Sequence, residues 1–278
     1  MTIRSGLIGR SILASRSPWL HEQEARAQGM QLDYALFDFT ARNLDDDALG
    51  DVLRDLRAQG FAGCNVTYPF KQRVMTLLDD LDASAEIVGA VNTIAIRSGR
   101  MTGHNTDMSG FRQSVVDGLS DVVLARVLQL GAGGAGAAVA SALLSLGVER
   151  LDIADLDLDR AGALVTMLNA RFGAGRARVR ARDDRATDRV DGIVNATPVG
   201  LAANPGLPID AAAITARHWV ADIVYFPLET DLLRLARTKG CRTLDGSGMV
   251  INQAATAFEI ITGAAANRDR MRASFFAT

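Results

Sequence analysis

The sequence has very little cysteine, with only Cys64 and Cys241 among 278 residues. Two cysteines so far apart form neither a disulfide framework nor the closely spaced ligands of a metal site, so we expect no metal. No apolar run approaches the length of a membrane span. The first residues read MTIRSGLIGR, which is too short and too interrupted for a signal peptide. These absences predict a cytoplasmic protein.

Excess charge is absent too, because the formal net charge is −2 and 48% of the residues are hydrophobic. This composition argues against a disordered chain and offers no basic surface for nucleic acid. The length suggests one large or two medium domains. We therefore expect a small-molecule substrate and neither a nucleic-acid nor a membrane partner. The choice between a monomer and a homodimer stays open.

Lysine is the third scarce residue. Lys71 and Lys239 are the only lysines, and the other 28 of the 30 basic residues are arginines. Such a chain can keep a lysine where a guanidinium does not serve, because lysine can lose its proton and arginine effectively cannot. Lys239 precedes Gly240 at a predicted helix end, where a surface cation suits the helix dipole. Lys71 is therefore the candidate for chemistry.

The most informative stretch runs from Val127 to Asp155 and reads VLQLGAGGAGAAVASALLSLGVERLDIAD. It contains an apolar strand, a G-x-G-x-x-G turn at Gly131, Gly133 and Gly136, an Ala-rich helix, a second strand and an acid. This order is the dinucleotide-binding fingerprint in its expected context. The helix N-terminus would attract the phosphates. The alternative interpretation is a simple Gly/Ala-rich turn that only packs a helix on a strand. That interpretation does not explain why an acid, Asp155, stands at the distance expected for a ribose-binding residue.

The acid of this stretch predicts the type of dinucleotide. Asp155 would accept hydrogen bonds from the ribose hydroxyls and repel a 2′-phosphate. Asp157 and Asp159 add negative charge, whereas Arg160 is a cation that could pair with these acids or reach a phosphate. Two like charges about 4 Å apart repel by about 4 kcal/mol at an effective dielectric near 20. The cofactor expected is NAD, with NADP less favoured.

The rest of the chain alternates predicted strands and helices. A helix capped by Asn43 is expected to run to Ala58, and the apolar segment from Met249 to Thr262 is expected to pack back on the first half. The predicted fold class is α/β, with two α/β domains and a cleft between them. Residues 1–107 plus 249–278 would bind substrate, and residues 108–248 would bind NAD on a Rossmann-type doubly wound parallel sheet.

Four polar clusters outside the nucleotide stretch are candidates for chemistry, at residues 15–18, 65–71, 92–93 and 103–107. Ser15 and Ser17 suit a carboxylate, although Ser17 could simply cap a helix. Lys71 is expected in the first turn of a helix, whose positive end would favour a neutral amine. Asp107 could pair with it or cap the next helix. Hydride removal from a secondary alcohol needs a general base, and a buried lysine beside a carboxylate suits that role.

Together these motifs resemble the shikimate dehydrogenase family, including its quinate/shikimate dehydrogenase branch, over nearly the whole chain. In the first half of the chain, the matching motifs are S-x-S-P from Ser15, N-V-T-x-P-x-K from Asn65, A-V-N-T from Ala90 and G-x-N-T-D from Gly103. In the second half they are G-A-G-G-A from Gly131, N-A-T from Asn195, D-x-x-Y from Asp222 and D-G-x-x-M from Asp245. A glutamine, Gln253, follows the last of them.

The resemblance implies a role for each matched position. Lys71 and Asp107 would be the catalytic pair. The residues that bind substrate or line its pocket would be Ser15, Ser17, Thr67, Asn92, Tyr225 and Gln253. The residues that bind the dinucleotide would be Gly131, Ala132, Gly133, Gly134, Ala135, Gly136, Asp155 and Thr197, with Ile223, Gly246 and Met249 near the nicotinamide.

The implied reaction is NAD-dependent hydride transfer between shikimate and 3-dehydroshikimate, in the shikimate pathway of aromatic amino acid biosynthesis. Quinate, or both acids, is the alternative substrate. Ser17 favours shikimate, because the quinate-preferring branch tends to carry Thr there, whereas His21-Glu22 is more similar to the quinate/shikimate branch. Leu156 favours NAD, because NADP-dependent relatives resemble one another in carrying Arg there.

Three other functions remain open. A non-catalytic paralogue that binds the same metabolite would keep the fold and could lose the pair of Lys71 and Asp107. A methylene-tetrahydrofolate or amino-acid dehydrogenase would lack the S-x-S-P and N-T-D motifs. A phosphate-binding or nucleotide-sensing module would not need a polar cleft between two domains.

Overall fold

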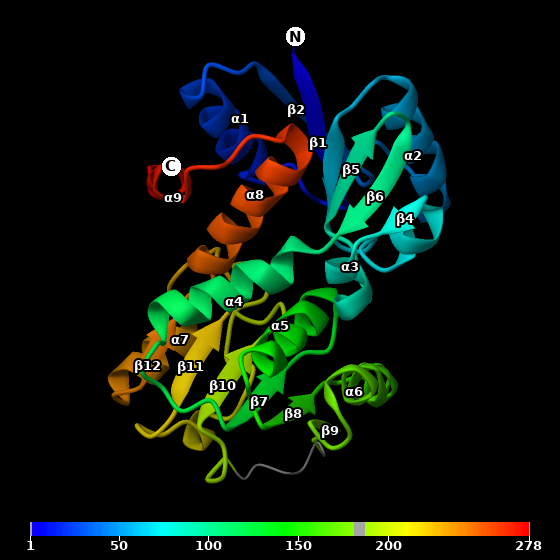
Figure 1. Cartoon of the computed structure of the whole chain (residues 1–278). Coiled ribbons are helices and arrows are strands. Elements are labelled where there is room, and N and C mark those ends of the chain that lie inside the picture. The colour runs from blue at the N-terminus through cyan, green and yellow to red at the C-terminus, as the bar shows by residue number, and fades with distance from the viewer. Residues whose placement is uncertain (1, 181–186, 278) are drawn as a thin grey trace. The chain divides into compact units, whose positions relative to one another are not determined.

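The computed structural model describes residues 2–180 and 187–277, and the chain divides into two compact units (Figure 1). Unit 1 comprises Met1–Thr106 and Ile251–Thr278, and unit 2 comprises Asp107–Val250. The units differ from the predicted domains only in the assignment of Asp107, Met249 and Val250. The roles assigned to the domains and the expected cleft stay predictions.

Unit 1 is built on a six-stranded sheet with the order β2-β1-β3-β5-β6-β4. Its strands are β1 (Ile3–Gly9), β2 (Leu32–Asp38), β3 (Gly63–Val66), β4 (Asp80–Leu81), β5 (Thr93–Arg97) and β6 (Arg100–His104). Strand β5 runs antiparallel to both neighbours, and the other neighbouring pairs are parallel. The carboxyl ends of β1, β3 and β6 therefore meet the amino end of β5 along one edge, which we call the carboxyl edge of unit 1.

Helices and short 3₁₀ segments complete unit 1. They are α1 (Ser17–Ala27), η1 (Asp46–Ala48), α2 (Leu49–Ala58), η2 (Arg73–Leu77), α3 (Ala83–Val88), the larger part of α8 (Ser247–Thr262) and α9 (Arg268–Phe276). Helix α2 buries Leu49, Leu53 and Leu56, which the helical period places on one face. They share a core with Phe39 and Phe70, whose rings lie 4.5 Å apart between centroids. The buried Phe70 ring fixes the turn between β3 and η2.

Two of the expected helix positions are wrong. Asn43 caps no helix, because it lies in a left-handed turn with φ of 51° and α2 begins only at Leu49, after η1. Asparagine tolerates this conformation because its short side chain can hydrogen-bond locally. Lys71 lies in the turn before η2 rather than in an α-helix. The dipole argument for a neutral Lys71 amine therefore fails.

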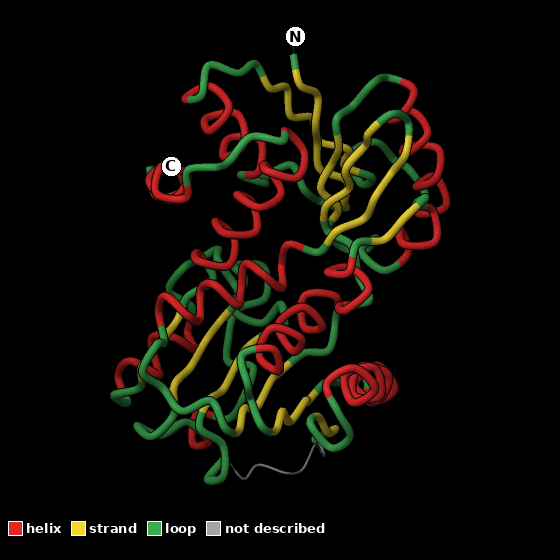
Figure 2. The backbone as a smooth tube through the Cα atoms, in the orientation of Figure 1, coloured by secondary structure: helices red, strands yellow, loops and turns green. Residues whose placement is uncertain are grey.

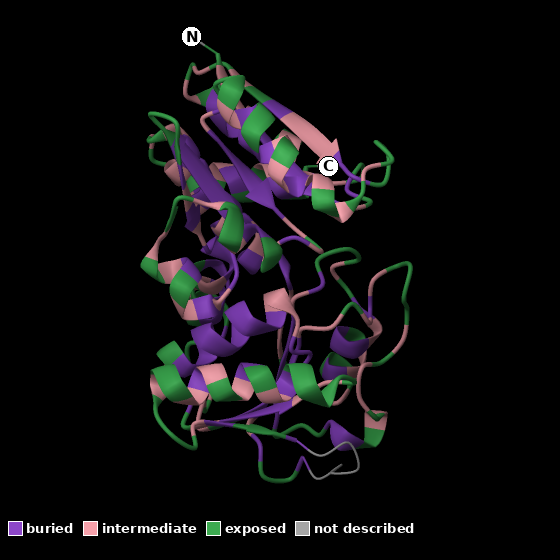
Figure 3. Cartoon of the chain, turned by 90° about the vertical axis from the view of Figure 1, so that its right-hand side faces the viewer, coloured by how far each residue is buried: buried purple, intermediate pink, exposed green. Residues whose placement is uncertain are grey.

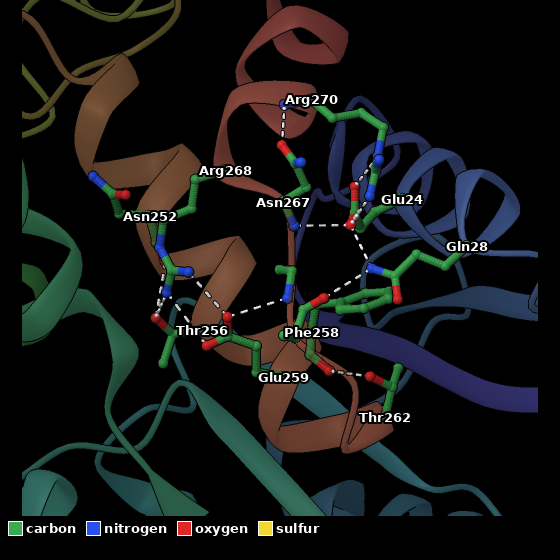
Figure 4. Close-up of polar contacts among 12 residues, drawn as sticks. Glu24, Gln28, Asn252, Thr256, Phe258, Glu259, Thr262, Asn267, Arg268 and Arg270 are labelled. Atoms are coloured by element: carbon green, nitrogen blue, oxygen red, sulfur yellow. Dashed lines mark hydrogen bonds and ion pairs between the residues drawn. The ribbon is translucent and has the colours of Figure 1, made fainter.

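The end of the chain is attached to α1 by a buried carboxylate (Figure 4). Glu24, only 1% exposed, accepts hydrogen bonds from Arg270 Nε and Nη2 at 2.7 and 2.6 Å. It also accepts from the backbone N–H of Asn267 at 2.9 Å and from Gln28 Nε2 at 2.6 Å. Burial alone would raise the pKa of Glu24, but these hydrogen bonds outweigh it and hold the pKa below the usual range. Helix α9 is thus held to α1 by an ionised group.

Unit 2 contains a six-stranded, fully parallel sheet with the order β12-β11-β10-β7-β8-β9. Its strands are β7 (Arg126–Leu130), β8 (Arg150–Ala154), β9 (Ala177–Val179), β10 (Gly192–Asn195), β11 (Trp219–Asp222) and β12 (Arg242–Leu244). The strand order reverses between β7 and β10, as in the Rossmann fold. The predicted doubly wound parallel sheet is confirmed.

Helices flank this sheet, as Figure 2 shows. They are α4 (Thr106–Gly118), α5 (Gly134–Ser145), α6 (Leu158–Phe172), α7 (Asp231–Thr238) and the 3₁₀ segment η3 (Ala211–Ala213). Helix α5 is buried without interruption from Gly136 to Leu144, whereas most other helices alternate buried and exposed residues (Figure 3). An apolar helix of this kind belongs in a core. No helix in the described ranges has the length and apolarity needed to cross a bilayer.

Candidate active site

The topology of unit 1 brings the polar clusters together at its carboxyl edge. Ser15 and Ser17 follow β1, Thr67 and Lys71 follow β3, and Asn92 immediately precedes β5. The segment from Asn105 to Asp107 follows β6, whose last residue, His104, pairs with Thr93. Segments far apart in the sequence thus meet on neighbouring strands. Ligands of open α/β sheets bind at this edge.

The two predicted carboxylate-binding serines lie side by side. Ser15 Oγ donates to Ser17 Oγ at 3.2 Å and accepts from the Ser17 backbone N–H at 3.2 Å. Helix α1 begins at Ser17 itself and its N-cap position is Arg16, so Ser17 is not the helix cap. Two adjacent hydroxyls at the start of a helix can both donate to one carboxylate.

Asn92 is the centre of a second group at this edge. Its side chain is buried, with Nδ2 donating to Thr106 Oγ1 at 2.9 Å and Oδ1 accepting from the Thr106 N–H at 2.8 Å. Gln253 reaches the same place from α8, with its Oε1 3.5 Å from Asn92 Nδ2 and 3.4 Å from Thr106 Oγ1. The structure therefore brings predicted Asn92 and Gln253 together. Thr106 was missed, although it stands inside the quoted G-x-N-T-D motif.

The segment that carries Thr67 and Lys71 is held by backbone hydrogen bonds. Thr67 N–H donates to the Ile8 carbonyl at 2.9 Å, and Val91 N–H donates to the Lys71 carbonyl at 2.8 Å. The half-buried Lys71 is thereby tied to the segment that leads into Asn92. Gly9 lets β1 pass close to Thr67, because a Cβ there would lie 2.5 Å from Thr67 Cγ2.

Asp107 is buried, with 5% of its surface exposed. Helix α4 begins at Thr106, so Asp107 stands in the first turn and is not the N-cap. The alternative interpretation, that Asp107 caps the N-terminus of this helix, is therefore wrong. Its pairing with Lys71 remains a prediction.

The glycine turn of unit 2 has the geometry that a dinucleotide needs. A Cβ at Gly131, where φ is +100°, would lie 2.6 Å from the Ala196 carbonyl oxygen, and one at Gly136 would lie 2.4 Å from the Gly131 carbonyl oxygen. A Cβ at Gly133 would meet nothing within 4 Å, so the space above the turn is open. Helix α5 starts at Gly134, and its first-turn N–H groups, between Gly134 and Gly136, are oriented to bind phosphate.

Asp155 follows β8 beside this turn, and both of its carboxylate oxygens accept hydrogen bonds within the chain. Its Oδ2 accepts from the Ala132 N–H at 2.6 Å, and its Oδ1 accepts from Arg160 Nη2 at 2.6 Å and the Asp157 N–H at 2.8 Å. Burial alone would raise its pKa, but these donors outweigh it and hold the pKa of Asp155 below the usual range. An ionised carboxylate has about four acceptor positions, so one stays open on Oδ2. That position suits a ribose hydroxyl.

The remaining predicted cofactor residues follow strands of the same sheet, and so does Tyr225, which was predicted to bind substrate. Thr197 comes after β10, and its hydroxyl donates to Asn195 Oδ1 at 2.7 Å. Ile223 comes after β11, and Gly246 packs so closely on it that a Cβ would lie 2.6 Å from the Ile223 carbonyl oxygen. Met249 is buried in the first turn of α8, and Tyr225 is 39% exposed just beyond β11. All of these positions lie past the carboxyl ends of parallel strands.

Asp222 is a further residue of this edge that sequence reasoning did not single out. It accepts from Asn195 Nδ2 at 2.9 Å, the Val224 N–H at 3.0 Å and the Thr230 hydroxyl at 2.8 Å. Burial raises its pKa, against the effect of these hydrogen bonds. Asp222 thus holds together the segments after β10 and β11. Its place at the start of the quoted D-x-x-Y motif was the available signal.

A polar hollow elsewhere in unit 2 does not belong to this edge. It has a volume of about 260 Å³ and is lined by Arg126, Arg150, Asp152, Arg178, Asp188, Arg189 and Val190. Arg126 and Arg150 begin β7 and β8, so the hollow lies at the amino ends of the strands. Across the described ranges, no group of three or more His, Cys, Asp or Glu side chains is arranged to hold a metal ion.

Comparison with known proteins identifies the family. The model of the shikimate dehydrogenase substrate binding domain matches residues 7–94, and that of the shikimate 5'-dehydrogenase C-terminal domain matches residues 246–274. The chain is 47% identical over 272 residues to a shikimate dehydrogenase (NADP(+)) of Arthrobacter sp. (strain FB24), covering 97% of this chain and 93% of the relative.

Two further relatives are named for quinate. The chain is 45% identical to a quinate/shikimate dehydrogenase (NAD(+)) of Corynebacterium efficiens, covering 99% of this chain and 98% of the relative. A solved structure of quinate dehydrogenase from Corynebacterium glutamicum in complex with NAD is similar over 100% of this chain and 99% of that one, with 43% identity and a TM-score of 0.93. The chain therefore belongs to the shikimate dehydrogenase family of NAD(P)-dependent oxidoreductases.

Proposed function

We propose that this chain catalyses reversible hydride transfer between a hydroxyl-bearing ring carbon of shikimate and a nicotinamide cofactor, giving 3-dehydroshikimate. The observation that carries the proposal is the carboxyl edge of unit 1. Three groups lie at this edge, next to the ends of neighbouring strands. They are the paired serine hydroxyls, which suit a carboxylate, the amide cluster around Asn92, which suits hydroxyls, and Lys71. A cyclic hydroxy acid needs this combination of partners.

In this mechanism Lys71 is the general base. When bound, the nicotinamide would accept a hydride from the reacting carbon, and the hydroxyl on that carbon gives its proton to the Lys71 amine, so that a carbonyl forms. The ammonium that results stabilises negative charge on the reacting oxygen, and Asp107 orients and balances it. Ser15 and Ser17 bind the substrate carboxylate, and Thr67, Asn92, Tyr225 and Gln253 contact its hydroxyls.

Quinate is the second candidate substrate, because relatives of similar identity are named for both acids. Quinate carries an additional hydroxyl on the carbon that bears the carboxylate. The segment around Ser15 and Ser17 is therefore where the two acids would be distinguished. Ser17 supports shikimate as the better substrate.

For the cofactor we propose NAD over NADP. Arg160 already donates to Asp155 at 2.6 Å, and Asp157 is a second acid 3.8 Å from the same guanidinium. A 2′-phosphate would have to displace this ion pair and approach an ionised carboxylate. Even about 2 kcal/mol of repulsion would weaken NADP binding by more than tenfold.

Initial-rate kinetics with both acids and both cofactors test the proposal. We expect the highest kcat/KM with shikimate and NAD, and at least a tenfold lower value with NADP. A higher kcat/KM with quinate would reverse the substrate order, and equal efficiency with NADP would refute the role of Asp155. No turnover of either acid would contradict the proposed function itself.

A further inference from the structure

One polar side chain interrupts the apolar strand that leads into the glycine turn of unit 2. Gln129 lies on β7 between Leu128 and Leu130, and it is fully buried. Central strands of a parallel sheet are almost continuously apolar, and a buried polar side chain there needs partners. Gln129 stands inside the dinucleotide stretch of the sequence, but it occupies none of the glycine positions of the motif. Its partners therefore indicate its role.

The side-chain amide of Gln129 holds two glycines of the turn. Its Nε2 donates to the Gly131 carbonyl at 2.8 Å and to the Gly136 carbonyl at 2.8 Å. Since both partners can only accept, the two N–H donors of the amide are both used. Gly136 leaves room for this approach, because a Cβ there would lie 3.2 Å from Nε2. One amide thus ties the first glycine of the motif to the third.

The first of these contacts reaches the acid that follows β8. The Gly131 carbonyl and the Ala132 N–H belong to one planar trans peptide unit. That N–H donates to Asp155 Oδ2 at 2.6 Å. The same peptide is therefore held at its carbonyl by Gln129 and at its N–H by Asp155.

The second contact reaches the start of α5. The Gly136 carbonyl shares a peptide unit with the Ala137 N–H, which donates to the Gly133 carbonyl at 2.8 Å. This peptide lies in the first turn of the helix, whose N–H groups are the ones that a phosphate would meet. Gln129 therefore links that end of the helix to the strand.

The glutamine also carries a cost in stability. Within the described ranges its Oε1 is buried and has no hydrogen-bond partner. A buried acceptor without a partner destabilises the folded chain, and an apolar side chain at this position would avoid that cost. The two N–H donors are therefore what this position gains from glutamine.

We propose that Gln129 is a positioning residue that fixes the glycine turn and the Asp155 carboxylate in the arrangement that binds the dinucleotide. The inference rests on the proposed function, since it assumes that the dinucleotide binds at this turn. Gly131 has a φ of +100°, and glycine has access to many backbone conformations. Without the amide its peptide can rotate, and Asp155 then loses one of the donors that orient it.

The test is Gln129→Met, which keeps a side chain of similar length and removes both N–H donors. We expect the Kd for NAD, from calorimetric titration of the whole chain, to rise about 5- to 10-fold, the value of about one net hydrogen bond. KM for shikimate and kcat at saturating NAD should change less than about twofold, because only the turn is disturbed. Gln129→Leu also lacks a donor and should weaken NAD binding to a similar extent.

Gln28→Met is the matched control. It makes the same substitution in unit 1, where Gln28 Nε2 donates to Glu24 Oε1 at 2.6 Å and to the Ala265 carbonyl at 2.9 Å. This variant also removes two hydrogen bonds, but none at the glycine turn. It should lower the melting temperature and leave the Kd for NAD within about twofold of the wild-type value.

A double-mutant cycle with Asp155→Ala tests the link to that carboxylate. If Gln129 acts largely by positioning Asp155, its loss matters less once the carboxylate is gone. Adding Gln129→Met to Asp155→Ala should therefore raise the Kd for NAD by less than about threefold.

Each outcome has a distinct meaning. An unchanged Kd in both Gln129 variants, an equal loss of affinity in Gln28→Met, or independent losses in the cycle would overturn the role of Gln129 and leave the proposed function intact. A wild-type chain that binds NAD but oxidises neither shikimate nor quinate would instead contradict the proposed function, and the titrations would still decide the role of Gln129.

Discussion

At the scale of single residues, the scarcity of lysine singles out Lys71. Replacing it with Ala should lower kcat by roughly 10²- to 10⁴-fold, the usual loss when a general acid–base is removed. Lys71→Arg should restore little of the lost kcat, because a guanidinium stays protonated and cannot act as a base. Stopped-flow or steady-state rates with saturating substrates measure the effect.

The other lysine supplies the control. Lys239 Nζ donates to the Ala211 and Ile214 carbonyls in unit 2, so Lys239→Arg changes the same chemical group away from the proposed site. It should leave kcat near the wild-type value. Near-normal turnover by Lys71→Arg would mean that this position supplies only charge.

The proposed preference for NAD also depends on single residues. Asp155→Asn combined with Leu156→Arg should raise the ratio of kcat/KM for NADP over NAD by at least about tenfold, because a cation replaces repulsion at the 2′ position. Leu156 is 82% exposed, so an arginine there costs little packing. Initial rates with both dinucleotides measure the ratio.

The matched control adds the same cation at the opposite edge of the sheet. Val123 is 62% exposed and precedes β7. Val123→Arg should leave the cofactor ratio unchanged. A similar shift in both variants would show that net charge alone decides between the dinucleotides.

At the scale of elements, the contact between α5 and the glycine turn is sensitive to one methyl group. Gly136→Ala would place a Cβ 2.4 Å from the Gly131 carbonyl oxygen, which must move. We expect KM for NAD to rise at least about tenfold together with a lower melting temperature, since overpacking costs about 1–3 kcal/mol. Calorimetric titration of NAD and thermal melting measure both effects.

Gly162→Ala in α6 makes the same change where nothing lies within 4 Å of the new Cβ. It should raise stability by about 0.5–1 kcal/mol, because alanine favours a helix over glycine, and leave NAD binding unchanged. If Gly136→Ala bound NAD normally, the close approach of α5 to the turn would not be needed.

The attachment of α9 to α1 predicts a pH dependence. Glu24→Gln should reduce the free energy of unfolding by about 1–3 kcal/mol near neutral pH, because Arg270 loses a buried ionised partner but remains 36% exposed to water. Since the folded-state pKa of Glu24 is lowered, its stabilisation is complete above the unfolded pKa. It disappears as pH falls through the folded pKa, so the difference should shrink below about pH 4.

Denaturant unfolding at several pH values checks this account. Asp51→Asn is the control, because the Asp51–Arg54 pair is exposed and should contribute less than about 1 kcal/mol. A Glu24→Gln effect that does not vary with pH would mean that the charge of Glu24 is unimportant.

The sequence predicted elements best where local signals and packing agree. In the stretch from Val127 to Asp155, the strand, glycine turn, helix, second strand and acid follow one another in the expected order. The errors at Asn43 and Lys71 have a common cause. A left-handed Asn43 and a turn fixed by the buried Phe70 ring depend on the surrounding fold, which local patterns do not encode.

At the scale of the whole molecule, the motifs pointed to residues that the two sheets gather at their carboxyl edges, and they did not point to the residues that support them. Ser17, Asn92 and Asp155 stood in recognisable patterns. Asp222 contacts Asn195 on a neighbouring strand that is distant in the sequence, so only the paired sheet reveals this contact. Both sheets place the predicted residues at carboxyl ends of strands, which is where two-domain dehydrogenases need them.

The most direct test of the whole account is the fate of the substrate hydrogen. Shikimate carrying deuterium on the carbon that bears the reacting hydroxyl is incubated with NAD and the purified chain, and the reduced cofactor is analysed by mass spectrometry. The account predicts one deuterium in the nicotinamide ring, lost in Lys71→Ala on the same timescale. Oxidation without label in the cofactor, or no oxidation by the wild-type protein, would contradict hydride transfer from shikimate.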